Sequence, residues 1–186
     1  MEVLEAIKTR RSIRQYKTTS VDNKAIELVL EAARWAPSWA NTQCWRFIVV
    51  RDSKIKSELA NVLSANNSAT DAVRSAPVVI VACAELGKAG YFRGEPGKSV
   101  TDKGDCWYMF DVALAMQNLV LVACSIGLGT VYVGAFDAKK TASILGVPKG
   151  FCVVAITPLG YPDQAPGPRP RKELSEIAFY DKFSSK

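Results

Sequence analysis

The stretch RRSIRQY, Arg10 to Tyr16, is the first part of the sequence whose residue types and spacing could do chemistry. It places three arginines and one serine within five positions. In an extended segment side chains alternate, so Arg10, Ser12 and Arg14 share one side and Arg11 lies on the other. Two guanidinium forks with a hydroxyl between them suit a phosphate. The stretch therefore indicates an anion site, although a solvated basic segment after a helix is an equally simple interpretation.

A second basic pair, Arg169 and Arg171, lies near the other end of the sequence in PGPRPRKEL. Alternation again places both side chains on one face, and the neighbouring prolines stiffen the backbone, so that little entropy is lost when a ligand binds. The pair could complete the same anion site from far along the chain. The alternative is a basic tail without a partner.

Composition favours a folded globular protein. The chain has 186 residues, of which 48% are hydrophobic and 23% are charged, and we expect one domain over residues 1–186. The net charge of +6 comes from basic residues spread along the chain rather than from one basic block. We therefore expect no nucleic-acid partner. The weaker alternative, an accessory nucleic-acid-binding domain, predicts strongly salt-dependent DNA binding.

The absence of histidine from the sequence excludes several classes of site. Ser-His-Asp and Cys-His hydrolases need that imidazole. There is no CxxC pair, so we expect no metal, and five widely spaced cysteines do not indicate a disulfide framework. The N-terminus carries acidic residues where a signal peptide is basic, and no run of eighteen apolar residues occurs. We expect a cytoplasmic protein that does not bind membranes.

Hydrophobic periodicity predicts helices interleaved with short strands, which is typical of an α+β or α/β three-layer domain. The predicted helices cover residues 2–9, about 22–36, 53–63, 105–126 and 138–145. The predicted strands are WRFIVV, VVIVAC, TVYVGAF and FCVVAITPLG. Ser20 or Asp22 could cap the second helix and Ser53 the third. GLGTVYVG follows a helix and precedes a strand, the reverse of a dinucleotide-binding loop, so we predict no such site there.

Three further segments have a predicted role. The helix at 105–126 is apolar almost all the way round, so we expect it to be buried on all sides and to contribute to a subunit interface. Residues 85–104 are rich in glycine and charge and are predicted to form a long functional loop. The tail from Tyr161 to Lys186 is too short to form its own core, and its apolar residues suggest that it packs onto something, with a second subunit as one option.

Four stretches follow one another along the chain: RRSIRQY, APSWANTQCWRF, DVALAMQNLVLVACSIGLGTVYVGAF and PRPRKEL. In this order they resemble the FMN-dependent nitroreductase family over almost the whole chain. The resemblance implies an α+β three-layer fold with a central, mainly antiparallel sheet flanked by helices. It also implies a homodimer with two FMN molecules in clefts between the subunits. FMN would take electrons from NADH or NADPH and pass them to nitro compounds, quinones or related small-molecule acceptors in alternating half-reactions.

The resemblance also assigns cofactor-binding residues. The phosphate and ribityl contacts are Arg10, Arg11, Ser12, Arg14, Arg169 and Arg171. The loop against the flavin of the neighbouring subunit contains Pro37, Ser38, Trp39, Asn41 and Gln43. The strand end whose N–H groups approach flavin N5 and O4 contains Gly134 and Ala135, where a glycine lets a backbone donor reach the ring. We expect no obligatory catalytic side chain, because the chemistry takes place at the flavin.

Three positions depart from the family pattern. Cys44 stands where the family commonly has proline, and it is either inert packing or a redox-sensitive thiol. Ser68 and Asp71 stand where relatives often have an asparagine and a basic residue. Trp39 is larger than the small residue common there, which would narrow the substrate cleft. Alternative activities on the same fold are reductive dehalogenation, ene reduction and azoline oxidation, and a non-catalytic flavin-binding protein is a further alternative.

Overall fold

A computed structural model describes residues 1–95 and 97–183 of the chain. Pro96, within the predicted loop at 85–104, and residues 184–186 of the predicted tail lie outside the described residues. The helices are α1 (Val3–Thr9), α2 (Asn23–Arg34), α3 (Ser53–Asn61), α4 (Thr70–Ser75), α5 (Cys106–Ser125), α6 (Ala138–Ile144) and α7 (Leu174–Ile177), with a 3-10 turn, η1, at Trp39–Asn41. The strands are β1 (Trp45–Val50), β2 (Val78–Glu85), β3 (Gly129–Thr130) and β4 (Phe151–Gly160).

The four strands form one antiparallel sheet in the order β1-β2-β4-β3. The sequence of β2, VVIVACAE, is continuously apolar up to its last residue, because this strand lies between β1 and β4 and is covered on both faces. Its register with β4 shifts between Ala82 and Cys83. The predicted mainly antiparallel α+β fold is confirmed.

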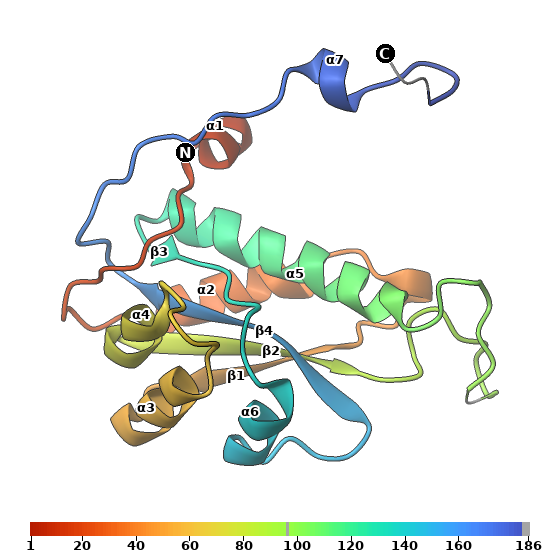
Figure 1. Ribbon diagram of the computed structural model, residues 1–186, viewed down its shortest axis with the longest axis horizontal. Coiled ribbons are helices and arrows are strands. Elements are labelled where there is room, and N and C mark those ends of the chain that lie inside the picture. The colour runs from red at the N-terminus through yellow and green to blue at the C-terminus, as the bar shows by residue number, and fades with distance from the viewer. Residues whose placement is uncertain (96, 184–186) are drawn as a thin grey trace.

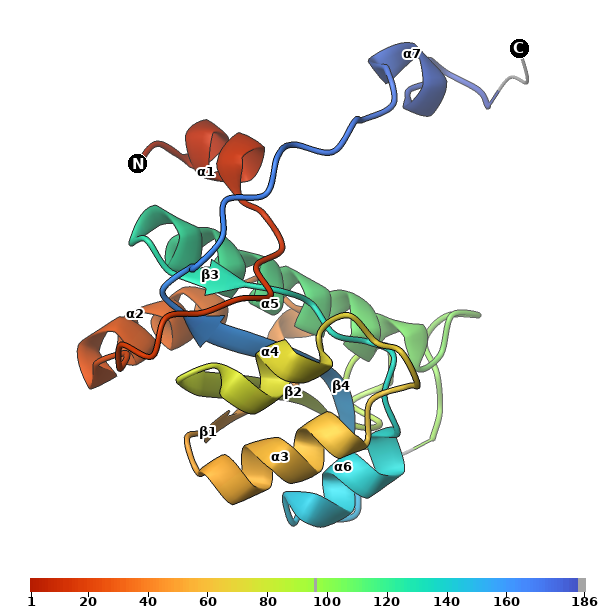
Figure 2. The same ribbon diagram turned by 60° about the vertical axis from the view of Figure 1, so that its left-hand side comes forward.

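Helices cover both faces of the sheet, which gives the predicted three layers (Figures 1 and 2). On one face Ile80 and Leu159 pack in a core cluster with α2 and α5. On the other face Val79 and Val81 pack in a second cluster that includes residues of α3 and α4 and, at its edge, of α6. The alternation of side chains along β2 therefore divides its apolar residues between two cores.

Helix α5 is covered on one side only. Its buried residues, among them Val112, Met116 and Leu119, face α2 and the sheet. The opposite side is open, with Phe110 56% exposed and Ala113 also exposed. The prediction that this helix is buried on all sides is therefore wrong for the single chain. By length and composition α5 could cross a membrane, and one side of it packs in the core cluster with α2 and the sheet.

The prediction of a strand at TVYVGAF is mostly wrong. Only Thr130 belongs to β3, and Val133 adds a single bridge to Ile156. The chain then leaves the sheet because its backbone finds other partners: the carbonyl of Ala135 accepts from the N–H of Ser64 at 3.0 Å and from Nδ2 of Asn67 at 3.1 Å.

The other predicted helices are present, whereas α4, α7 and the 3-10 turn η1 were not predicted. Asp22 caps α2 as predicted, accepting from the N–H of Ala25 at 2.7 Å. Helix α3 begins at Ser53 but is capped by Asp52, whose carboxylate accepts from two backbone N–H groups. Helix α4, whose six residues TDAVRS show too short a pattern to detect, was not predicted.

The segment after α1 forms an outer margin of the sheet. Ser12 bridges Thr130 in parallel, and the N–H of Ile13 donates to the carbonyl of Thr130 at 2.9 Å. The Ile13 side chain is buried over Gly129, where a Cβ would lie 2.7 Å from its Cγ1 and 2.8 Å from its Cβ. The tail leaves β4, passes the same margin and carries α7 away from the body of the fold in both views (Figures 1 and 2).

We predict that Gly129→Ala lowers the free energy of unfolding by about 1–3 kcal/mol, because the new methyl group overlaps Ile13 near its backbone. Gly134→Ala is the matched control, since nothing lies within 4 Å of a Cβ there. Urea unfolding followed by circular dichroism measures both. Equal stability of the two variants would show that the contact between Ile13 and Gly129 is not tight.

Candidate functional site

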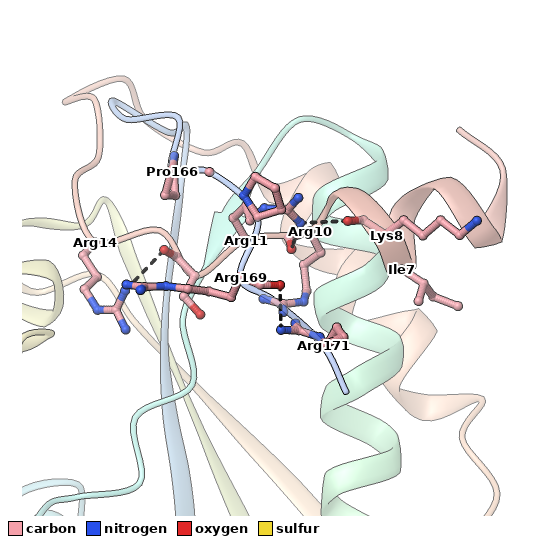
Figure 3. Close-up of a pocket in the computed structure, with 11 residues that line it drawn as sticks. Ile7, Lys8, Arg10, Arg11, Arg14, Pro166, Arg169 and Arg171 are labelled. Atoms are coloured by element: carbon pink, nitrogen blue, oxygen red, sulfur yellow. Dashed lines mark hydrogen bonds between the residues drawn. The ribbon is translucent and has the colours of Figure 1, made fainter. Parts of the chain in front are cut away.

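Positively charged side chains line a pocket of about 550 Å³ between the N-terminal segment and the tail (Figure 3). The end of α1 provides Lys8, and the adjoining segment provides the predicted residues Arg10, Arg11, Ser12 and Arg14. Residues 166–171 of the tail form the opposite wall and bring in the predicted pair, Arg169 and Arg171. The structure thus brings together the two basic clusters that lie at opposite ends of the sequence.

The lining contains six cationic side chains and, among the described residues, no carboxylate. Mutual repulsion between these cations is left uncompensated by any ion pair in the described part of the chain, since none of the recorded ion pairs includes them. Guanidinium groups from two walls can donate to several oxygens of one anion. The pocket therefore fits a phosphate group.

The structure shows why the prediction for Arg11, which assumed that side chains alternate strictly along an extended segment, was too simple. Arg10 follows the last residue of α1, and of residues 10–12 only Ser12 makes a bridge to another segment, so these residues do not form a regular strand. The Arg11 guanidinium folds back and donates from Nη1 to the carbonyls of Lys8 and Arg10, each at 2.8 Å. It caps the carbonyl end of α1 and still lines the pocket.

The other predicted loop, residues 37–43, does not contribute to this pocket. It forms a turn beside the beginning of α5, whereas β3 lies at the helix's other end (Figure 1). The N-terminal segment that lines the arginine pocket bridges β3 between Ser12 and Thr130. A 20-residue helix is about 30 Å long. In one chain the two predicted parts of the cofactor site are therefore separate, which is compatible with the two-subunit site that the resemblance implies.

The turn at Ser38–Gln43 has an unusual backbone. Ala40, Asn41 and Gln43 have φ values of 43°, 55° and 47°, in the left-handed region that non-glycine residues rarely occupy. The Oγ of Ser38 accepts from the N–H of Gln43 at 2.9 Å and closes the turn. Asn41 and Gln43 are exposed, and Trp39 is half-buried.

A buried carboxylate that sequence reasoning missed lies beneath this turn. Asp111 of α5 is 1% exposed. Both of its oxygens accept from the N–H of Trp39, at 3.0 and 3.1 Å, and one also accepts from Oγ1 of Thr42 at 3.5 Å. Burial raises the pKa of Asp111, and these donors oppose the rise. The available signal was a lone aspartate within the apolar run DVALAMQNLVLVAC.

Cys44 is fully buried, and its Sγ lies 3.7 Å from Oδ2 of Asp111. Burial raises the pKa of the Cys44 thiol to about 12, and the negative Asp111 adds to the rise. Because only the thiolate is reactive, this environment favours inert packing over a redox-sensitive thiol.

Gly134 and Ala135, the predicted donors to the flavin ring, are exposed. Within the described part of the chain neither N–H donates a hydrogen bond to another residue. The space beside Gly134 is open. Two free, adjacent backbone donors are therefore accessible to a ligand, although these residues do not line the arginine pocket.

The described part of the loop at 85–104 contacts the turn at Ser38–Gln43. Nη2 of Arg93 donates to the carbonyl of Ala40 at 2.9 Å. Trp39 lies against Trp107 with ring centroids 4.5 Å apart, and Trp107 meets Phe110 edge-on at 5.8 Å. These three rings form an aromatic cluster at the beginning of α5.

We predict that iodoacetamide at pH 8 modifies the exposed Cys106 of the native protein and leaves Cys44 unmodified, because a thiol with a pKa of about 12 is almost entirely protonated there. Peptide mass spectrometry measures the labelling, and protein in guanidinium chloride, where both cysteines should react, is the control. Native labelling of Cys44 at the rate of Cys106 would contradict the inert assignment.

Known proteins are similar to this chain in sequence and in fold. Residues 7–161 match the pattern of the Nitroreductase family. A Methanothermobacter thermautotrophicus protein provisionally named NADH dehydrogenase/NAD(P)H nitroreductase is 33% identical over 173 residues, which cover 91% of this chain and 82% of that protein. A nitroreductase family protein of known structure from Clostridium novyi NT has a TM-score of 0.76 and 36% identity, with 87% of each chain covered.

The structure of NADPH:FMN oxidoreductase from Vibrio harveyi, which was solved with NAD+, has a TM-score of 0.85. It is 27% identical to this chain, and the match covers 98% of this chain and 78% of that one. The sequence resemblance is thus confirmed by the family pattern and by the fold: the chain belongs to the nitroreductase family.

Proposed function

We propose that this protein is an FMN-dependent oxidoreductase that takes a hydride from NADH or NADPH and reduces a small-molecule acceptor. The observation that carries the proposal is the arginine pocket, which has the charge and donor groups for the FMN phosphate, in a chain of the nitroreductase family. The similar protein from Vibrio harveyi is named for NADPH and FMN. On this proposal, residues 1–186 form one FMN-binding domain, and the protein is cytoplasmic.

The chain's own residues would bind and orient the cofactor, and FMN, when bound, supplies the redox chemistry. Arg10, Arg14 and Arg171 would hold the phosphate, with Arg169 and Ser12 beside them. Arg11 would act mainly by fixing the end of α1, since its guanidinium already donates to two carbonyls. With no histidine in the chain, proton delivery would depend on water and the cofactor rather than on an imidazole.

The free N–H groups of Gly134 and Ala135 are proposed to donate to the flavin ring. Backbone donors that need no reorientation stabilise negative charge that develops during reduction, as in an oxyanion hole. Their exposure and the lack of other acceptors in the described chain support this role. The arginines would then fix one end of the cofactor, and Gly134 and Ala135 would fix the other.

A homodimer is part of the proposal. The turn at Ser38–Gln43 and the arginine pocket adjoin opposite ends of α5, so a second copy would have to bring its turn to the flavin. The open side of α5 and the projecting tail support this arrangement. Leu174 is 77% exposed and Phe183 is 84% exposed, and exposed apolar side chains of this size favour burial against a partner.

We propose that the acceptors are planar nitroaromatics or quinones. The acceptor and the nicotinamide would bind in turn at the same place. The aromatic cluster of Trp39, Trp107 and Phe110 supports this choice, because stacked rings favour flat, apolar ligands. Trp39 would narrow the cleft and exclude bulkier molecules.

The decisive experiment is anaerobic. The purified protein, supplied with FMN, should show flavin absorption near about 450 nm that NADH or NADPH bleaches, and a nitroaromatic or a quinone should restore it. Restoration by a halophenol alone would instead indicate reductive dehalogenation. A bound flavin that neither nicotinamide bleaches would contradict an oxidoreductase and favour a flavin-binding protein.

We predict that Arg14→Ala and Arg171→Ala each weaken FMN binding by about ten- to a hundredfold, because a desolvated charge-assisted phosphate contact contributes roughly 1.5–3 kcal/mol. Fluorescence titration with FMN measures the dissociation constants. Arg74→Ala, which removes a half-exposed cation paired with Asp71, is the matched control and should leave the affinity unchanged. Unchanged affinity in both pocket variants would rule out the pocket as the phosphate site.

We predict that Phe110→Arg raises the dissociation constant of the dimer by more than about tenfold, because an unpaired charge buried in an apolar interface costs on the order of 2 kcal/mol or more. Light scattering after gel filtration over a range of concentrations measures the dimer. Phe92→Arg, in the loop and 45% exposed against 56% for Phe110, is the control. A Phe110→Arg dimer as tight as the wild type would place the interface elsewhere.

A further inference from the structure

The turn at Ser38–Gln43 requires a support, because its backbone is unfavourable. Ala40, Asn41 and Gln43 all have positive φ, and none of them is glycine. Such conformations persist only where surrounding contacts over-determine them, and they often occur at functional sites. The hydrogen bonds within the turn, such as Thr42 N–H to the Trp39 carbonyl at 2.8 Å, link its residues to one another but not to the core.

Asp111 provides that link to the core. Its two oxygens accept from the backbone of Trp39, at the beginning of the turn, and from the Thr42 hydroxyl near its end. The Cys44 thiol, just past the turn, lies beside the same carboxylate at 3.7 Å. All three groups are donors that point at the Asp111 carboxylate, which in its ionised form only accepts hydrogen bonds. One carboxylate therefore fixes the turn at both ends.

The position of Asp111 is suited to this task. Its neighbour Val112 is fully buried, so α5 is fixed against α2 and the sheet at this point. The second contact to the turn, from Arg93 to the Ala40 carbonyl, comes from an exposed loop and gives a less rigid support. A buried carboxylate is costly to desolvate, and the donors of the turn offset that cost. An apolar side chain in this place would leave the Trp39 N–H and the Thr42 hydroxyl without an acceptor, so the aspartate is matched to the turn and not only to the packing around α5.

We propose that Asp111 is a positioning residue of the active site. It fixes the turn at Ser38–Gln43 in the shape in which Ser38, Trp39 and Asn41 face the flavin of the second subunit. The effect on the flavin rests on the proposed function, whereas the effect on the turn does not. Because the arginine pocket lies toward the other end of α5, retention of FMN and the shape of the turn are separable properties.

Asp111→Asn tests this with almost no change in volume. The amide keeps one acceptor oxygen but presents an NH2 group where a second acceptor was needed. In flavin-free protein, amide hydrogen exchange of residues 38–44 should become about tenfold faster, while exchange in β2 and the middle of α5 stays the same. FMN affinity should fall by less than the ten- to hundredfold expected for Arg14→Ala, because the arginine pocket is intact and only the contact of the turn with the flavin is loosened. The KM for NADH or the acceptor should rise about tenfold with a smaller change in kcat.

Asp52→Ala is the matched control for loss of a carboxylate that accepts two backbone N–H groups. It should lower the melting temperature but leave both the exchange of residues 38–44 and the KM unchanged. Arg14→Ala should do the reverse of Asp111→Asn, releasing FMN without altering exchange of the turn. If Asp111→Asn does not fold, Thr42→Val removes one donor to the same carboxylate and should accelerate the same exchange by a smaller factor.

Unchanged exchange of residues 38–44 in Asp111→Asn, or faster exchange spread over the sheet as well, would overturn the proposal. Faster exchange of the turn with unchanged kinetic constants would overturn its assignment to the active site. Failure of the proposed function is distinguishable, because it appears as wild-type protein that neither binds FMN nor oxidises NADH or NADPH. The exchange measurement on flavin-free protein still decides whether Asp111 fixes the turn.

Discussion

Repulsion among the cations of the arginine pocket is the constraint on which the rest of this site depends. Six positive side chains line one pocket, and among the described residues no carboxylate lines it with them. Solvent and salt reduce the repulsion but do not remove it at such short range. The fold must therefore position these groups with other contacts. The buried Ile13 over Gly129 and the stiff tail beside it provide them, and a bound phosphate would compensate the charge.

The length of α5 is a second constraint. It separates the arginine pocket from the turn that Asp111 supports, so on the proposed account each subunit contributes one part of two sites. The same helix has an open side where a second copy could pack. Cofactor binding and dimer formation would then depend on each other, because the flavin would contact residues of both chains. A rigid helix between the two parts keeps their spacing fixed.

The sequence predicted those parts of the structure that local patterns determine. The strand β2 was predicted correctly from its continuous apolar run, because burial is visible in composition. Residues of RRSIRQY and PRPRKEL line one pocket, an arrangement that their charge had suggested. The strand at TVYVGAF was wrong because its backbone partners, Ser64 and Asn67, lie in a distant loop. Asp111 was missed for a similar reason: its function depends on contacts with residues about 70 positions away, which no local pattern shows.

The central claim is that the arginine pocket binds the phosphate of FMN. Calorimetric titration of the flavin-free protein with FMN and with riboflavin, which differ only in that phosphate, tests it most directly. The account predicts that FMN binds at least about a hundredfold more tightly, through two or more charge-assisted contacts. It also predicts that added salt reduces the difference. Equal affinity for the two flavins at low salt would contradict the account.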